Sequence, residues 1–385
     1  MKDKLYIVGS GPGSNSQLTD IAKLTIYDAK RVLCTRELPM KTIMSKLKDS
    51  ANSGTVVLVS GDSGFFSLGK SIVSEFSDIY DIEVIPGISS IQYFCSKLKT
   101  SYDDAVIISL HGREGSIVPK VAYNKKVIAL TGGDNSAQSI CEKLCKHGLG
   151  NVIVSVGERL SYKEERIVVK KAADIIDMEF DALVVLCIEN ACAANPHRTL
   201  YDKDFERKNI PMTKEEVRWI STQKLGVCPQ DIVFDIGAGS GSVSVELARK
   251  AFDGFVFAIE KREAACDLIR VNALMHGAHN IEIVEGEAPW AFDVLPVPDK
   301  AFIGGSCGNM GSIIENLISR NPSIRLVANA VTMQTVQEAI DSYRKHGIKN
   351  TDIVCVNIAK SMKTGGYDMM TAQNPVYIIT GNGEA

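Results

Sequence analysis

Residues 232–242 read IVFDIGAGSGS, an apolar run that passes directly into a turn with three glycines. Glycine allows a tight turn and a close approach of the backbone to a ligand, because no Cβ stands in the way. A strand followed by such a turn predicts an open parallel sheet that binds its ligand beyond the carboxyl ends of the strands. A helix is expected at Val243–Lys250, and the next strand, Phe255–Ile259, leads into Glu260. A carboxylate at that place can accept hydrogen bonds from both ribose hydroxyls of a nucleoside.

Two nucleoside cofactors fit this outline, NAD and S-adenosylmethionine. The dinucleotide fingerprint requires Gly or Ala at its sixth place, which is Ser242 or Ser244 here, depending on the glycine from which it is counted. The D-x-G-x-G-x-G form that starts at Asp235 resembles the class I S-adenosylmethionine methyltransferases instead. We therefore expect S-adenosylmethionine as the cofactor and S-adenosylhomocysteine as its product.

The rest of the second half continues the alternation of strands and helices. Upstream, Thr213 is followed three residues later by Glu216, which predicts a helix N-cap with a capping box. That helix would turn Val217, Trp219 and Ile220 toward the core. Further elements are expected at Arg262–His276 (helix) and at the strands Ile281–Val284, Lys300–Ile303, Ile324–Ala328, Asp352–Ile358 and Val376–Thr380. Together they predict one open, mostly parallel sheet with helices on both faces.

The first half is a second α/β layered region. Helices are expected at Leu18–Ala29 and Asn135–His147. Strands are expected at Leu5–Val8, Thr55–Val59, Glu83–Ile85, Ala105–Ser109, Lys126–Leu130, Val152–Val156 and Leu183–Ile188. The alternation lapses over residues 195–211, a polar stretch bounded by prolines. We therefore predict two domains, residues 1–200 and 201–385, with unrelated α/β folds.

Composition narrows the classes of partner. The formal net charge of −3 gives no overall attraction to nucleic acid or to an anionic membrane. No apolar run reaches the roughly 18–20 residues that span a bilayer, and no signal-peptide pattern is present, so a cytoplasmic location is expected. The ten cysteines form no CxxC pair and no zinc-like spacing with histidine. We expect no metal site and mostly buried, reduced thiols, as in the apolar runs around Cys187 and Cys355.

Four motifs in the second half narrow the family. They are TKEEVR at 213–218, GEAP at 286–289, FIGGSCG at 302–308 and ANAVT at 328–332. In this order they resemble the decarboxylating precorrin methyltransferase family over about residues 211–380. Cys307 departs from that pattern, which often has glycine there. The resemblance implies that the cofactor contacts are Thr213, Gly237, Ala238, Gly239, Ser240, Gly241, Glu260 and Ala288.

The first half carries a different set of motifs. They are VGSGPG at 8–13, SGDSGFFS at 60–67, PGISS at 86–90, SLHGR at 109–113, LTGG at 130–133 and GERLS at 157–161. Over residues 3–200 they resemble the tetrapyrrole methylases, the class III S-adenosylmethionine methyltransferases, and in particular the branch that methylates carbon 5. Ser63 stands where that family usually has proline. The resemblance implies that the cofactor contacts are Gly61, Asp62, Phe65, Gly87, Ser89, Ser90, Thr131 and Gly132, and that His111 and Arg113 face the substrate.

Together the two resemblances imply a fused, decarboxylating methyltransferase of the precorrin-6Y type. It would methylate a (cobalt-)precorrin-6B/7-type corrin ring at carbons 5 and 15 and decarboxylate the ring C acetate, in cobalamin biosynthesis. Cations suit the acetate and propionate groups of such a substrate. The candidates in the second half are Lys214, Arg218, Lys360 and Lys363. No catalytic acid is assigned, and the resemblance implies a homo-oligomer.

Two other functions fit part of the pattern. The class I sheet also serves RNA and protein methyltransferases. The chain has neither a base-extruding [ND]PP[YF] motif nor an overall basic charge, which disfavours an RNA substrate. A non-catalytic sensor that binds S-adenosylmethionine or a tetrapyrrole is the other alternative, and two complete sets of cofactor loops disfavour it.

Overall fold

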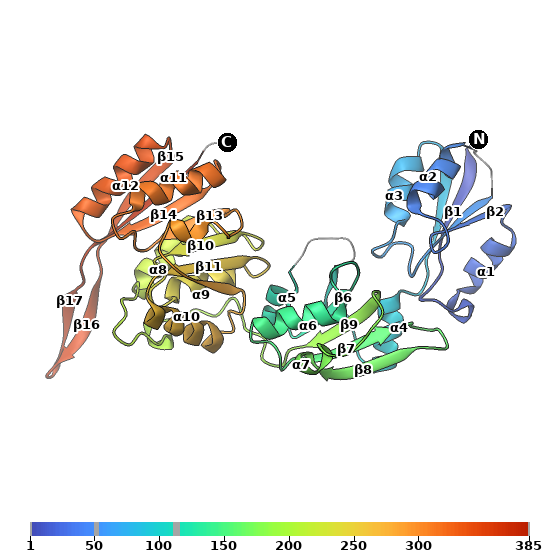
Figure 1. Cartoon of the computed structure of the whole chain (residues 1–385), viewed down its shortest axis with the longest axis horizontal. Coiled ribbons are helices and arrows are strands. Elements are labelled where there is room, and N and C mark those ends of the chain that lie inside the picture. Colours follow the sequence, from blue (N-terminus) through green and yellow to red (C-terminus); the bar gives the residue numbers. More distant parts are fainter. Residues whose placement is uncertain (1, 50–53, 111–115, 384–385) are drawn as a thin grey trace. The chain divides into compact units, whose positions relative to one another are not determined.

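A computed structural model describes residues 2–49, 54–110 and 116–383 (Figure 1). The chain divides into two compact units. The first comprises Met1–Gly115, Lys125–Lys146 and Gly150–Ala191, and the second comprises Ser116–Asn124, His147–Leu149 and Cys192–Ala385. The polar stretch 195–211 groups with the second unit, because Leu200 and Phe205 are buried in the core of that unit.

The first unit begins with a four-stranded parallel sheet in the order β2-β3-β1-β4. Its strands are β1 (Asp3–Gly9), β2 (Arg31–Cys34), β3 (Thr55–Val59) and β4 (Tyr80–Ile85). Its helices are α1 (Asp20–Tyr27), α2 (Met40–Asp49) and α3 (Gly69–Phe76), with a 3-10 turn at Asn15–Gln17. Apolar side chains alternate across the strands. As a result, α2 and α3 pack on one face, with Leu5 and Ile7, and α1 packs on the other, with Val8.

A five-stranded sheet follows in the same unit, in the order β5-β6-β9-β7-β8. Only β5 and β6 pair in parallel, and β9 runs antiparallel to both of its neighbours. Its strands are β5 (Val106–Ser109), β6 (Lys126–Leu130), β7 (Ile153–Glu158), β8 (Arg166–Lys171) and β9 (Val184–Glu189). Helix α4 packs on it through Ile91 and Phe94. The helices of this region are α4 (Ser90–Leu98), α6 (Ala137–Lys146) and α7 (Ala172–Ile175), while α5 (Ile117–Tyr123) groups with the second unit.

The second unit contains a seven-stranded sheet in the order β12-β11-β10-β13-β14-β18-β15. Five strands are parallel, and β18 runs antiparallel between β14 and β15. The strands are β10 (Ile232–Ile236), β11 (Phe255–Glu260), β12 (Ile281–Glu285), β13 (Lys300–Ile303), β14 (Arg325–Ala330), β15 (Lys349–Val356) and β18 (Val376–Asn382). One face packs against α8 (Glu215–Leu225), α9 (Ser242–Lys250) and α10 (Glu263–Met275). The other packs against α11 (Met310–Arg320) and α12 (Met333–Lys345). Two 3-10 turns lie at Asp202–Asp204 and Trp290–Phe292.

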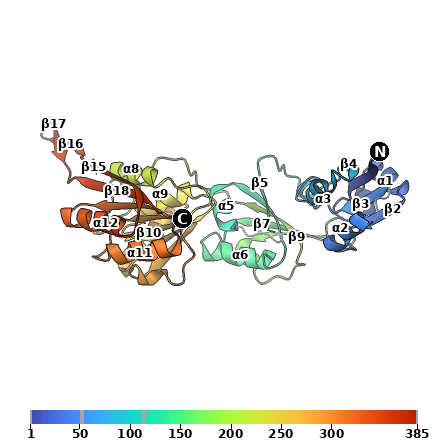
Figure 2. The same ribbon diagram turned by 90° about the horizontal axis from the view of Figure 1, so that it is seen from above.

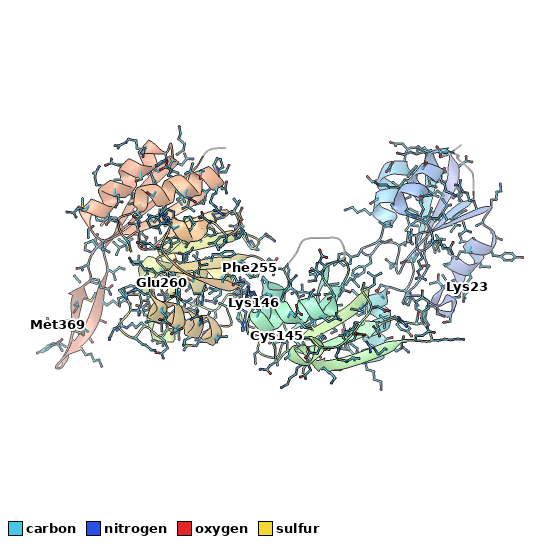
Figure 3. All side chains as sticks on the ribbon, viewed as in Figure 1. Lys23, Cys145, Lys146, Phe255, Glu260 and Met369 are labelled. Carbon is cyan, nitrogen blue, oxygen red and sulfur yellow. The ribbon has the colours of Figure 1, made fainter. Side chains whose placement is uncertain are left out.

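A separate hairpin, β16 (Ala359–Thr364) and β17 (Tyr367–Ala372), extends away from this sheet (Figures 1 and 2). Its exposed apolar side chains include Met362, Tyr367 and Met369, and the last of these is labelled in Figure 3. Within the part of the chain that the structure describes, no helix has the length and apolar character needed to cross a membrane.

Two local predictions are wrong. Helix α8 is capped by Lys214 rather than Thr213, and no side chain caps it, because the first helical hydrogen bond runs from Arg218 N to the Lys214 carbonyl. Cys355 is exposed because β15 is an edge strand, and Cys192, Cys228 and Cys307 are exposed as well. Buried thiols are found at Cys95, Cys141, Cys187 and Cys266.

Candidate functional site

A cavity of about 1030 Å³ lies at the carboxyl ends of the parallel strands in the second unit. Every parallel strand contributes to its wall. The lining includes the turn after β10, the end of β11, the turns after β12 and β13, and the end of β14. The start of α8 and the base of the β16–β17 hairpin line it as well. Open α/β sheets bind their ligands at this edge, so the cavity is the candidate site of the second unit.

The turn after β10 requires glycine. Gly237 has a φ of +71°, and a Cβ on it would lie 2.7 Å from the carbonyl oxygen of Gly305 in the turn after β13. Gly237, Ala238 and Gly239, for which the resemblance implied cofactor contacts, all line the cavity. Ser240 is 1 % exposed, and its carbonyl accepts a hydrogen bond from Asn272. Ser240 and Gly241 therefore support the turn from behind rather than line the cavity.

Glu260 lies at the end of β11 with 5 % of its surface exposed (Figure 3). One carboxylate oxygen accepts from Gly239 N at 2.9 Å, and the other accepts from Arg262 N and Nε at 3.1 and 3.0 Å. Burial by itself would raise the pKa of Glu260, but the hydrogen bonds from Arg262 and Gly239 outweigh burial and hold the pKa below its usual value. An ionised acceptor therefore lines the cavity next to the glycine turn.

Asp235 lies behind the same turn and is fully buried. Its Oδ2 accepts from Ser244 Oγ at 2.5 Å, while its Oδ1 has no partner among the described residues. Burial raises the pKa of Asp235 to about 7, the charge of Glu260 adds to that rise, and the hydrogen bond from Ser244 opposes it. The environments of these two carboxyl groups thus shift their pKa values in opposite directions.

The wall beyond the cofactor loops is formed by α12, the end of β14 and the base of the hairpin. Its polar side chains are Asn329, Gln334, Thr335, Glu338, Gln373 and Asn374. Sequence reasoning assigned none of them a role, although ANAVT, which contains Asn329, was among the motifs. Ser221 Oγ donates to Asn329 Oδ1 at 3.0 Å, and Asn329 Nδ2 is shielded from solvent without a partner among the described residues.

Three cations line this cavity, Lys214, Lys261 and Arg262. Lys261 pairs with Glu287 at 3.5 Å and Arg262 with Glu260 at 3.0 Å. Lys214 forms no ion pair with the residues that the structure describes. Thr213 and Ala288, the other implied cofactor contacts of this half, also line the cavity.

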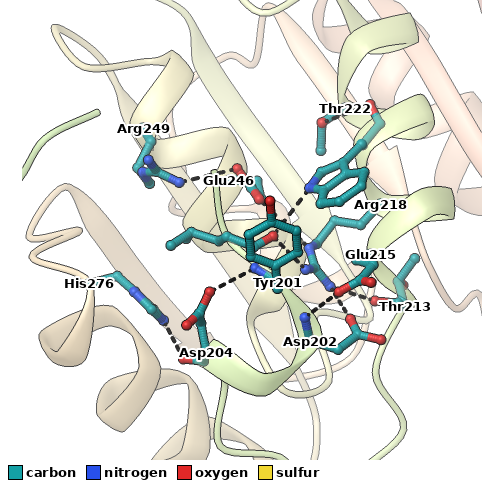
Figure 4. A network of polar contacts seen from close by, with 12 residues as sticks. Tyr201, Asp202, Asp204, Thr213, Glu215, Arg218, Thr222, Glu246, Arg249 and His276 are labelled. Atoms are coloured by element: carbon teal, nitrogen blue, oxygen red, sulfur yellow. Dashed lines mark hydrogen bonds and ion pairs between the residues drawn. The ribbon is translucent and has the colours of Figure 1, made fainter. Parts of the chain in front are cut away.

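Arg218 was expected among the substrate contacts, and this expectation is wrong. Its side chain is fully buried and binds Asp202 Oδ1 at 3.0 Å and the Thr213 carbonyl at 2.8 Å (Figure 4). It also lies over the Phe205 ring, with 4.7 Å between the guanidinium carbon and the ring centroid. Arg218 therefore joins the segment before the helix to α8. The TKEEVR motif gave no sign of these contacts, because the partners of Arg218 lie in the segment before the helix.

The two remaining candidate lysines lie on β16. Lys360 Nζ contacts Glu215 at 2.7 Å and Glu216 at 2.8 Å, so its charge is already paired at the base of the hairpin. Lys363 is exposed farther along the same strand. Lys214 is thus the candidate cation that is both unpaired among the described residues and part of the cavity wall.

In the first unit, three glycine loops meet at the ends of β1, β3 and β4. A Cβ on Gly9 would lie 2.6 Å from Gly87 N and 2.8 Å from the Gly61 carbonyl. Asp62 joins these loops, because Oδ2 accepts from Gly87 N at 3.0 Å and Oδ1 accepts from Gly64 N at 2.9 Å. Ser89 caps α4 in a reciprocal pair with Gln92, and Ser90 is the first helical residue. The structure therefore brings Gly61, Asp62, Gly87, Ser89 and Ser90 together.

The other candidates of this unit lie nearer the five-stranded sheet. Phe65 packs against the core cluster that contains Ile91 and Phe94. The Thr131 hydroxyl accepts from Val184 N at 2.8 Å, so the backbone of β9 already holds this side chain. Gly132 pairs with Asn135 in a turn. His111 and Arg113 lie outside the described residues.

Sequence reasoning missed Arg36. Its guanidinium donates to the carbonyls of Gly11 and Gly13 at 2.9 and 3.1 Å and to Tyr162 Oη at 3.2 Å. It thus fixes the loop after β1. Arg36 belongs to none of the motifs, so the sequence carried no local signal for this role.

Comparison with known proteins places both halves. The precorrin methyltransferase domain model matches residues 203–381, and the tetrapyrrole (corrin/porphyrin) methylase model matches residues 35–176. A precorrin-6Y C(5,15)-methyltransferase (decarboxylating) of Sinorhizobium sp is 30 % identical over 405 residues, covering 98 % of this chain and 95 % of the relative. A probable cobalt-precorrin-6B C(15)-methyltransferase (decarboxylating) of Saccharolobus solfataricus is 39 % identical over 47 % of this chain and 93 % of the relative. A crystal structure of a precorrin-6y C5,15-methyltransferase from Geobacter metallireducens matches with 38 % identity and a TM-score of 0.46, covering 48 % of this chain and 96 % of that one.

Proposed function

Because the chain belongs to the family of fused precorrin-6Y C(5,15)-methyltransferases (decarboxylating), we propose a division of labour between its halves. The chain is an S-adenosylmethionine-dependent C-methyltransferase of cobalamin biosynthesis, and its substrate is a tetrapyrrole. Residues 1–200 would form the domain that methylates carbon 5. Residues 201–385 would form the domain that methylates carbon 15 and removes the carboxyl group of the ring C acetate.

The cavity at the sheet edge is the observation that carries this proposal for the second half. Its residues fit S-adenosylmethionine, because ionised Glu260 offers acceptors for ribose hydroxyls and the Gly237–Gly239 turn leaves room for close approach. The cofactor supplies an electrophilic methyl group on a sulfonium. The protein contributes position and orientation, which account for much of the rate in such a transfer. Thr213 and Ala288 would complete the cofactor end of the wall.

The converging loops of the first unit support the proposal for the other half. Gly61, Gly87 and Ser89 would offer backbone groups to a second molecule of cofactor. Asp62 would act through these loops, since both of its oxygens are bonded to loop amides. Phe65, Ser90, Thr131 and Gly132 remain proposed contacts of the same site.

The proposal also covers the binding of the substrate carboxylates, the location of the enzyme and its oligomeric state. Lys214 would bind a carboxylate that the substrate retains, because its charge is unpaired among the described residues and it lines the cavity. Nucleic acid and membrane have no part in the proposed reaction. We place the enzyme in the cytoplasm as a homo-oligomer, in line with the family resemblance.

Mass spectrometry tests the proposal directly. A precorrin-6-type tetrapyrrole, with and without cobalt, is incubated with the full chain and S-adenosylmethionine. Two added methyl groups with the loss of one carbon dioxide are expected. Glu260→Ala should abolish the carbon 15 reaction alone, and Asp62→Ala the carbon 5 reaction alone. If both tetrapyrroles return unchanged while the chain still binds S-adenosylmethionine, the proposal fails, and RNA acceptors and a sensor role become the hypotheses to test.

A further inference from the structure

The side chain of Asn329 is fixed at the cavity wall with one group unused. Asn329 lies near the end of β14 and faces α8, where the hydroxyl of fully buried Ser221 donates to its Oδ1 at 3.0 Å. Its Nδ2 is shielded from solvent and has no acceptor among the described residues. Buried donors are nearly always paired in folded proteins, so an unpaired one beside a cavity indicates that a ligand atom completes it. The missing partner is an acceptor such as a carboxylate oxygen.

The wall that α12, the end of β14 and the base of the hairpin contribute to the cavity carries one acid and no cation among its lining residues. The polar neighbours of Asn329 on this wall include the amides of Gln334, Gln373 and Asn374, and Glu338 on α12 is the acid. Two of the lining cations, Lys261 and Arg262, lie at the end of β11 and are paired with acids. Lys214 lies seven residues before Ser221, about 10 Å farther along the axis of α8 at the usual helical rise. Among the described residues that line the cavity, no lysine or arginine comes from the wall that contains Asn329.

That environment suits a carboxylate that is to be lost. Decarboxylation breaks the bond between the acetate methylene carbon and the carboxyl carbon. The electron pair stays on the methylene carbon, conjugated with the macrocycle, carbon dioxide leaves, and a proton from water completes the methyl group. A lysine or arginine paired with the carboxylate would stabilise the ground state most, because the negative charge moves away in the transition state. A neutral amide orients the same group with less stabilisation of the ground state.

We infer that the Asn329 side-chain amide binds the acetate carboxylate that leaves as carbon dioxide, with Ser221 as its positioning residue. This inference rests on the proposed function and adds the group that selects which carboxylate is removed. Asn329 touches the substrate, whereas Ser221 acts only through the orientation of the amide. The carboxylates that the substrate keeps would bind cations such as Lys214.

The test uses the full chain, a precorrin-6-type tetrapyrrole and S-adenosylmethionine, with carbon dioxide release and methyl transfer measured separately. Asn329→Asp places a like charge at the carboxylate, and Asn329→Leu removes the donor while keeping the side-chain volume nearly constant. Both should slow carbon dioxide release about tenfold to a hundredfold, the range for loss of one oriented donor to a charged group. Ser221→Ala should slow it less. Methylated species that keep every carboxyl group should accumulate.

Binding and control measurements make the result specific. The affinity of the second half for S-adenosylmethionine, measured in an Asp62→Ala background, should not change in these variants, which shows that the second unit folds. Methylation of carbon 5, which the proposal assigns to the first half, should not change either. Asn350→Asp, an exposed asparagine of β15 with φ +51°, is the matched control and should match the wild type. The inference is overturned if the Asn329 variants release carbon dioxide at the wild-type rate, or if they lose S-adenosylmethionine binding. A wild-type chain that leaves the tetrapyrrole unchanged instead refutes the proposed function.

Discussion

Replacement of Arg218 by alanine should lower the stability of the second unit more than replacement of any exposed charged residue does. The guanidinium is fully buried, and it binds Asp202 and the Thr213 carbonyl in the segment that enters α8 (Figure 4). It also lies over the Phe205 ring. Breaking a buried pair costs about 3–5 kcal/mol, because the partner is left without compensation. The lower end applies here, since the Asp202 side chain is 23 % exposed and water can solvate it.

The assay is differential scanning calorimetry of the full chain. For a unit of this size, about 3 kcal/mol corresponds to a fall of roughly 6–12 °C in the transition of the second unit. The first unit should melt unchanged, so the two transitions separate the effect. Arg218→Lys should recover only part of the loss, because an ammonium cannot reproduce the planar contact with Phe205 together with the two hydrogen bonds.

Arg270 provides the control for this prediction. It pairs with Asp267 on the surface of α10 at 2.6 Å, with the two side chains 53 % and 66 % exposed. Exposed pairs contribute about 0–1 kcal/mol, so Arg270→Ala should shift the transition by no more than about 4 °C. The argument fails if Arg218→Ala and Arg270→Ala produce equal shifts.

Three further predictions concern the cavity. Burial raises the pKa of Asp235 from 3.8 to about 7. Between these pH values the folded state keeps a proton that the unfolded chain loses. The free energy of unfolding should therefore fall by on the order of 4 kcal/mol as the pH rises from 3.8 to 7. Asp235→Asn should flatten that fall in urea unfolding at pH 4 and pH 8, and an unchanged difference would contradict the assignment. Gly237→Ala should weaken S-adenosylmethionine binding at least about tenfold in calorimetric titration, because its Cβ would lie 2.7 Å from the Gly305 carbonyl oxygen. The control is Gly366→Ala in the hairpin turn, whose Cβ would meet no atom within 4 Å, and this variant should bind S-adenosylmethionine normally. Lys214→Glu should raise KM for the tetrapyrrole about tenfold without changing the affinity for S-adenosylmethionine, and an equal effect from Lys345→Glu on the surface of α12 would argue for a general charge effect.

Buried strands were predictable because they are mostly apolar and lead into turns that contain glycine. Thr55–Val59, Lys126–Leu130, Ile232–Ile236 and Lys300–Ile303 begin and end as expected. The hairpin β16–β17 was missed, since AKSMKT and YDMMTA pack on no core and carry no alternating pattern. Strand β8 was missed for a similar reason, because RIVVKK is polar at both ends and half exposed.

The candidate site was predictable where backbone shape selects the residue. Glycine loops leave a mark in the sequence, and the turn at Gly237–Gly239 lines the cavity. Partners brought together by tertiary packing leave no such mark. The pairing of Arg218 with Asp202 and of Asn329 with Ser221 depends on segments 16 and 108 residues apart. The spacing of residues along the sequence therefore could not distinguish a side chain that binds substrate from a buried side chain that holds two segments together.

The topology of the seven-stranded sheet also constrains how the enzyme is made. Among the described strands, β15 pairs only with β18, and β18 separates it from β14. During translation, β15 therefore leaves the ribosome before the strand that will hold it exists. The base of the hairpin and the end of β14 both line the cavity. The sheet that supports them is therefore complete only after residues 376–382 have been synthesised. The first unit pairs its strands among themselves, so its sheets can be completed well before residue 376, once β9 has joined β6 to β7. A nascent chain paused before residue 376 would hold one folded domain and one unfinished domain with apolar strands exposed to chaperones.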